Sequence, residues 1–123
     1  MKFDVVEMLA WFASMLGVST DTSNIETGIS SRSKYASIDE LINGVAVSFK
    51  ASIALDESWY VLGMVAENED GNTATMSVCI DGNVATIGME DGNGVYTVAI
   101  YESAADVPWE DISDKANKVI SSL

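Results

Sequence analysis

The chain has 123 residues, of which 48% are hydrophobic, and its 19 acidic and 6 basic residues give a formal net charge of -13 at pH 7. This length and composition are those of a single globular domain, residues 1–123, and they argue against wholesale disorder. The charge argues against direct binding to nucleic acid or to an anionic membrane, because the few basic residues are too scattered to form a basic stripe.

The N-terminal residues predict an amphipathic helix over 3–17. Its polar positions, Asp4, Glu7 and Ser14, fall on one narrow stripe at helical spacing, and Gly17 is a suitable stop. Acids stand where a signal peptide carries positive charge, and the uncharged run that follows is too short to cross a bilayer. We therefore expect a folded helix in a cytoplasmic protein.

Trp11 lies on the same stripe as the polar residues of this helix. We expect its ring to pack at the edge of the core, partly exposed. The alternative is an aromatic anchor in a protein interface, a position in which tryptophan is enriched.

Two features predict what lies between this helix and the sheet. Residues 18–36 are rich in Ser, Thr and Asn without a clean period, so they form either a mobile loop or an edge strand around 24–30. Ser37-Ile38-Asp39-Glu40 then fits a capping box, and Gly44 fits a helix stop. The second feature predicts a short helix before the first strand.

Over 45–55 large apolar residues alternate with small or polar ones, which predicts a strand, and four more strands are predicted over 59–66, 73–80, 84–89 and 95–101. The connections Asp70-Gly71-Asn72, Asp81-Gly82-Asn83 and Asp91-Gly92-Asn93-Gly94 favour the left-handed φ values of tight hairpins. The result is a five-stranded antiparallel β-meander.

A last helix is predicted over 108–122, with Pro108 in the first turn and i,i+4 ion pairs Asp111–Lys115 and Asp114–Lys118. The expected fold class is therefore α+β: a five-stranded antiparallel meander packed by an N-terminal and a C-terminal helix, with a short helix before the first strand. Strands 59–66 and 95–101 are apolar on both faces, so a second cover is required. It could be segment 18–36, strong curvature of the sheet, or a homodimer partner, which we favour.

Catalytic signatures are absent from the sequence. There is no histidine, and Cys79 is a lone thiol, so neither an internal disulfide nor a histidine-dependent site is possible. The oxygen-rich segment 67–72 lacks the ligand order of an EF-hand and is interpreted as a solvated hairpin tip. We expect no enzyme activity, cofactor or metal site; an enzyme that uses carboxylates alone ranks last.

The meander predicts where the acids gather, because alternate turns point to opposite ends of the sheet. One end receives Glu67, Glu69, Asp70, Glu90 and Asp91, with the two loops about 10 Å apart. The opposite end receives Asp56, Glu57, Asp81, Glu102 and Asp106. Acidic hairpin ends either keep a sheet with two apolar faces from aggregating or dock on a basic groove of a partner.

Two functions follow as hypotheses. A small, acidic, histidine-free chain resembles, in general character, phage-encoded anti-defence and DNA-mimic proteins, which implies an inhibitor or decoy on a partner's basic, nucleic-acid- or nucleotide-handling surface. Its partner-binding residues would be those of the first acidic end together with Trp11. The acids gather at tips, however, whereas a mimic of duplex phosphates spreads them over a face.

The second hypothesis rests on the first helix. Met8-Leu9, Phe12-Ala13 and Leu16-Gly17, followed by an antiparallel sheet and a terminal helix, resemble the small acidic type III secretion chaperones. The helix that those proteins place between later strands is missing. The resemblance implies a dimer that captures an extended peptide on an apolar face.

Overall fold

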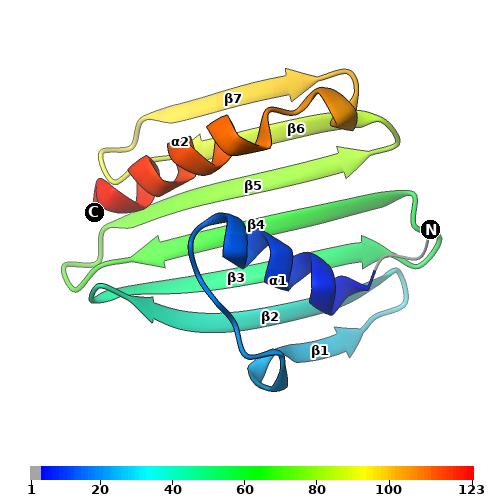
Figure 1. The fold of residues 1–123 in the computed structure, drawn as a ribbon, viewed down its shortest axis with the longest axis horizontal. Coiled ribbons are helices and arrows are strands. Elements are labelled where there is room, and N and C mark those ends of the chain that lie inside the picture. The colour runs from blue at the N-terminus through cyan, green and yellow to red at the C-terminus, as the bar shows by residue number, and fades with distance from the viewer. Residues whose placement is uncertain (1–3) are drawn as a thin grey trace.

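The protein is a single antiparallel sheet with two helices on one face, as a computed structural model describes it for residues 4–123 (Figure 1). Residues 1–3, the start of the predicted first helix, lie outside the described residues. The elements are α1 (Val5–Met15), β1 (Glu26–Ile29), β2 (Ser33–Ile42), β3 (Val45–Ala54), β4 (Trp59–Glu67), β5 (Thr73–Asp81), β6 (Val84–Glu90), β7 (Tyr96–Tyr101) and α2 (Trp109–Ser121), with short 3-10 turns at Thr22–Asn24 and Ala104–Asp106.

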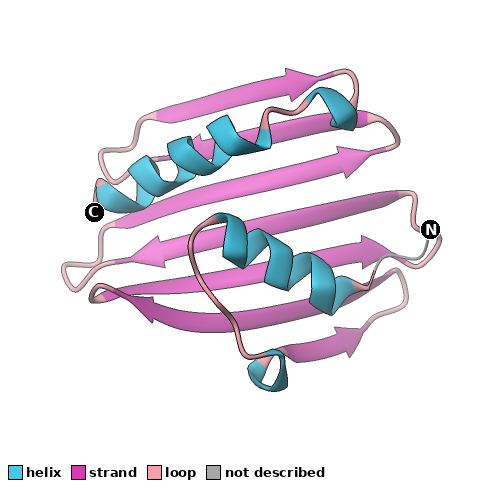
Figure 2. Cartoon of the chain, in the orientation of Figure 1, coloured by secondary structure: helices cyan, strands magenta, loops and turns pink. Residues whose placement is uncertain are grey.

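The seven strands lie in the order of the sequence, each antiparallel to the next (Figures 1 and 2). The α+β class, the antiparallel meander and the two packing helices are therefore confirmed, and the prediction of five strands is wrong. The two additional strands are β1 and β2. Of the alternatives for segment 18–36, the edge strand is the correct one, since β1 lies inside the range 24–30.

The predicted short helix is also wrong, because β2 occupies its place. Ala36 and Ile38 are buried on the helix-covered face, and β2 pairs with β3 along its full length of ten residues. Asn43 and Gly44 both have positive φ, 51° and 82°, as a two-residue hairpin of type I′ requires. The glycine that suggested a helix stop belongs to this hairpin, and the hydrogen bonds to β3 outweigh the local capping preference.

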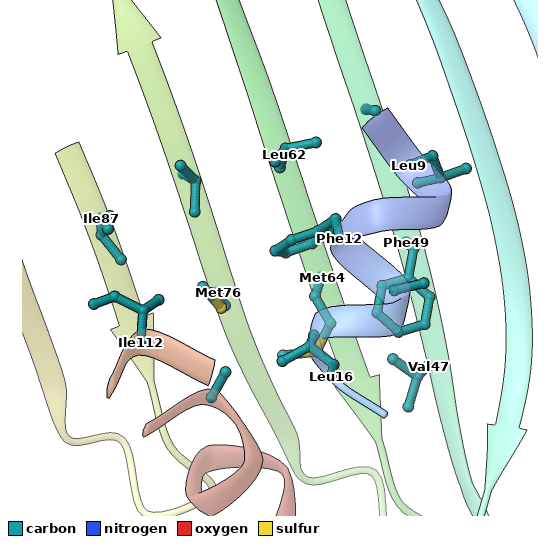
Figure 3. Close-up of a cluster of buried hydrophobic side chains, with 14 of the residues drawn as sticks. Leu9, Phe12, Leu16, Val47, Phe49, Leu62, Met64, Met76, Ile87 and Ile112 are labelled. Atoms are coloured by element: carbon teal, nitrogen blue, oxygen red, sulfur yellow. The ribbon is translucent and has the colours of Figure 1, made fainter. Parts of the chain in front are cut away.

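The core lies between the sheet and the helices, with α1 against β2 and β3 and α2 against β5 and β6. Phe12 of α1 meets Phe49 of β3 edge to face, with ring centroids 6.1 Å apart (Figure 3). Ile112 of α2 lies over Ile87 of β6 in the same view. No polar or charged residue among residues 4–123 is buried, so this layer is purely apolar.

The two helices also contact each other. Trp11 and Trp109 pack edge to face with ring centroids 5.1 Å apart, and the Ser113 hydroxyl donates a hydrogen bond to the Met15 carbonyl at the end of α1. On α2 the predicted Asp111–Lys115 ion pair is present, at 3.1 Å. The predicted Asp114–Lys118 pair is not formed in the described part of the chain.

Phe49 is the residue on which the α1 half of the core should depend most. Because its side chain is fully buried, Phe49→Ala should lower the free energy of unfolding by about 3–5 kcal/mol. Leu41→Ala, at a site 75% exposed, should change it by less than about 0.5 kcal/mol. Urea denaturation followed by circular dichroism measures both, and equal losses would contradict this description of the core.

Candidate functional site

Five acidic residues lie at one end of the sheet, as the meander topology requires. The β4–β5 and β6–β7 connections are both at the left end in Figure 1. Glu69 and Asp70 belong to the first connection and Asp91 to the second, while Glu67 and Glu90 are the last residues of β4 and β6. We call these five residues the acidic rim; its two loops are separated by two strand spacings, about 10 Å.

The two rim loops share one hydrogen-bonded conformation. In the first, the backbone N–H groups of Asp70 and Asn72 donate to the Asn68 side-chain oxygen at 3.1 and 3.0 Å. In the second, the N–H groups of Asn93 and Val95 donate to Asp91 Oδ1, both at 2.9 Å. Each loop thus winds around the side chain of its first residue, as Asn and Asp commonly allow.

The backbone hydrogen bonds of the two rim loops are also equivalent. The N–H of the fourth residue, Gly71 or Gly94, donates to the carbonyl of the first, and both glycines have left-handed φ, 82° and 80°. The sequence predicted turns at 70–72 and 91–94 but missed that the first loop begins at Asn68. The signal was available: Asn or Asp stands three residues before a glycine in both loops.

Asp91 therefore has a structural role in its loop. The carboxylates of the other four rim residues, Glu67, Glu69, Asp70 and Glu90, form no hydrogen bond or ion pair in the described part of the chain. All four are exposed. Four of the five rim carboxylates are thus unpaired negative charges, held on two ordered loops and on the strand ends beside them.

The second loop is also fixed to the end of α2. The Gly92 N–H donates to the Ser122 hydroxyl at 2.8 Å. A Cβ at Gly92 would lie 3.0 Å from both the Ser122 carbonyl oxygen and the Leu123 side chain, so a larger residue would push the loop away from the helix. This contact connects the rim to the covered face of the sheet.

The opposite end of the sheet carries the second predicted group of acids, on the β3–β4, β5–β6 and β7–α2 connections. There the Asp56 carboxylate accepts hydrogen bonds from the Ser58 hydroxyl at 2.6 Å and the Ser58 N–H at 3.0 Å. These two bonds hold the pKa of Asp56 below its ordinary value of 3.8. Like Asp91, this acid shapes its own turn.

Trp11 does not belong to the rim. It lies against Trp109 and the residue is 44% exposed, which agrees with the expectation of a partly exposed side chain at the edge of the core. Its partner is 98 residues further along the chain and could not be identified from spacing. The interface role proposed for Trp11 is left as a prediction.

The face of the sheet away from the helices, which we call the open face, has no cover in the described residues. Segment 18–36 contains β1 and the start of β2 and so extends the sheet, which makes it the wrong one of the three alternatives for the second cover. Ser77 and Cys79 lie on this face, beside Gly63 and Val61 of β4. A shallow hollow of about 360 Å³ lies over Gly63, bordered by Ser48, Lys50, Val65, Thr75 and Ser77.

Residues 4–123 contain no group of three or more cysteine, aspartate or glutamate side chains placed to hold a metal ion. Neither of the two described helices has the length and apolar character needed to cross a bilayer. Comparison with protein-family models, curated proteins and solved structures finds no significant match to this chain.

The equivalence of the two loops predicts which substitutions they tolerate. Asp91→Asn should change the free energy of unfolding by less than about 0.5 kcal/mol, because Asn68 already fills the same position in the other loop. Asp91→Ala should cost about 1–2 kcal/mol, since two hydrogen bonds lose their acceptor. Thermal unfolding of both variants is the measurement, and equal destabilisation would refute the equivalence.

The Asp56 turn predicts a pH effect. Because the pKa of Asp56 is lowered in the folded state, its contribution to stability is present above pH 3.8 and is lost as the pH falls through the folded-state value. An NMR titration should give Asp56 a pKa below 3.8, and Ser58→Ala should raise it towards 3.8. Ser77→Ala, on the open face, should leave it unchanged; an Asp56 pKa insensitive to Ser58→Ala would contradict the assignment.

Proposed function

We propose that this protein is a non-catalytic, cytoplasmic binding module that docks its acidic rim on a basic surface of a partner protein, as an inhibitor or decoy. The supporting observation is the pair of equivalent loops that hold Glu67, Glu69, Asp70 and Glu90 exposed and unpaired at one end of the sheet. The partner's surface would be one that handles nucleic acid or nucleotides, since such surfaces carry clustered Arg and Lys side chains.

The order of these loops favours binding over a purely solubilising role. Solubility requires only charge, whereas each rim loop is held by two backbone and two side-chain hydrogen bonds, and the second is also bonded to α2. An ordered loop loses little backbone conformational entropy when its carboxylates bind a cation. The carboxylates can then accept short, charge-assisted hydrogen bonds from arginine.

A second candidate function, a chaperone-like module for extended peptides, is favoured by the apolar side chains on the open face. Trp59 and Val61 are partly exposed there, and Val65 is 48% exposed. Capture of an apolar peptide would leave the rim free and would depend weakly on salt. Salt dependence therefore separates the two candidates.

Charge-matched variants test the proposed function. The rim variant combines Glu67→Gln, Glu69→Gln, Asp70→Asn and Glu90→Gln; the control combines Glu57→Gln, Asp81→Asn, Glu102→Gln and Asp106→Asn at the opposite end. Each removes the same charge from acids without hydrogen-bond partners. Binding to an arginine-rich peptide, measured by calorimetry at low salt, should weaken by about tenfold more in the rim variant, a difference of about 1.4 kcal/mol.

Two results would contradict the proposal. Equal losses in both variants would show that only the overall charge attracts the peptide. Binding by the wild type that does not weaken as salt is raised would exclude an electrostatic docking surface. A pull-down from lysate at low and high salt, with the two variants as baits, then identifies proteins that depend on the rim.

A further inference from the structure

One edge of the sheet is open and uncharged. β7 is the last strand, and no backbone hydrogen bond in the described residues joins it to any segment except β6. In Figure 1 it forms the upper border of the molecule, and α2 lies over β5 and β6 without reaching its outer edge. The outward N–H and C=O groups of β7 are therefore available to another strand.

The sequence of β7 has none of the features that usually block edge pairing. Tyr-Thr-Val-Ala-Ile-Tyr contains no charge, proline or glycine, and every residue except alanine is β-branched or aromatic. Its open-face side chains are highly exposed: Tyr96 62%, Val98 50% and Ile100 67%. The other edge strand, β1, has only four residues and includes Glu26 and Gly28.

We propose that two copies of this chain pair through β7, antiparallel, and so extend the sheet across a two-fold axis. The charge of the chain favours a second copy as the partner at this edge. In a chain of net charge -13, an uncharged strand is a place where two copies can meet without opposing carboxylates. A basic partner would gain nothing from this edge.

The two-fold symmetry also restricts which residues of the two β7 strands can lie opposite each other. A two-fold axis perpendicular to the sheet keeps the two open faces on the same side, so a residue of one copy must face a residue of the same parity in the other. With Val98 opposite Val98, Tyr96 faces Ile100 of the second copy, an aromatic and β-branched pair of the kind that stabilises sheets. A shift of the axis to Ala99 would instead bring Tyr96 opposite Glu102.

This arrangement leaves the acidic rims free, because antiparallel copies place them at opposite ends of the joined sheet. One strand pair gives an interface near the lower limit for specific dimers, about 1,200 Å² of total buried surface, so association should be reversible. It should strengthen with added salt, which screens the repulsion between two acidic copies. Docking of the rim on a basic partner would weaken under the same change.

Sedimentation equilibrium of the full chain at moderate salt tests the dimer, with two lysine variants. Val98→Lys places like charges across the axis and should convert the dimer to monomer. Val65→Lys is the matched control: its site is equally exposed, 48% against 50%, and lies on the same face but on the central strand β4. It should leave the dimer intact, and circular dichroism verifies that both variants fold.

A cysteine variant tests the register. On a Cys79→Ala background, Val98→Cys should form a disulfide-linked dimer under mild oxidation, whereas Ser77→Cys, on β5 and away from the edge, should not.

A monomeric wild type at all soluble concentrations would overturn the proposal, as would a dimer that survives Val98→Lys.

Discussion

The register of the strands is the constraint on which the rest of the structure depends. Side chains alternate between faces, so one buried row on each strand, such as Val47, Phe49, Ala51 and Ile53 on β3, must face the helices together with its neighbours. A shift by one residue in any hairpin would expose that row and bury its polar neighbours. The tight turns between strands prevent this, because their length and positive φ values allow one pairing.

The same register separates charge from apolar surface. No acid among residues 4–123 is buried, and most acids between β1 and β7 lie in a turn or at the last residue of a strand. Glu67, Glu69, Asp70 and Glu90 therefore gather at one end, whereas Tyr96, Val98 and Ile100 form an uncharged edge along the side of the sheet. We propose different partners for the two surfaces: a cationic surface for the rim, and an uncharged strand for the edge.

Most of the fold follows from local patterns, and the errors have local causes. The bounds of β3 to β7 were predicted to within one residue, because turn residues, Asp-Gly in three of the four connections, separate the apolar segments. β2 was missed because Ser37 and Glu40 imitate a capping box and Gly44 imitates a helix stop. Asn43 before that glycine, and the alternation of Ala36, Ile38 and Ile42, are equally local signals and indicate a hairpin.

By itself the sequence determined the antiparallel pairing of β3 to β7, the two helices and the end of the sheet at which the acids between those strands lie. Turn chemistry and side-chain periodicity are properties of neighbouring residues and need no knowledge of distant ones. Only the tertiary structure decided that Asp91 stabilises its own loop while Glu90 stays unpaired, that Trp11 packs on Trp109, and that Gly92 is bonded to Ser122. The Trp11–Trp109 and Gly92–Ser122 contacts join residues far apart in the chain. The different roles of Asp91 and Glu90 depend on the exact conformation of the loop. Contacts between distant residues arise from how the helices pack on the sheet, and the spacing of neighbouring residues in the sequence does not specify that packing.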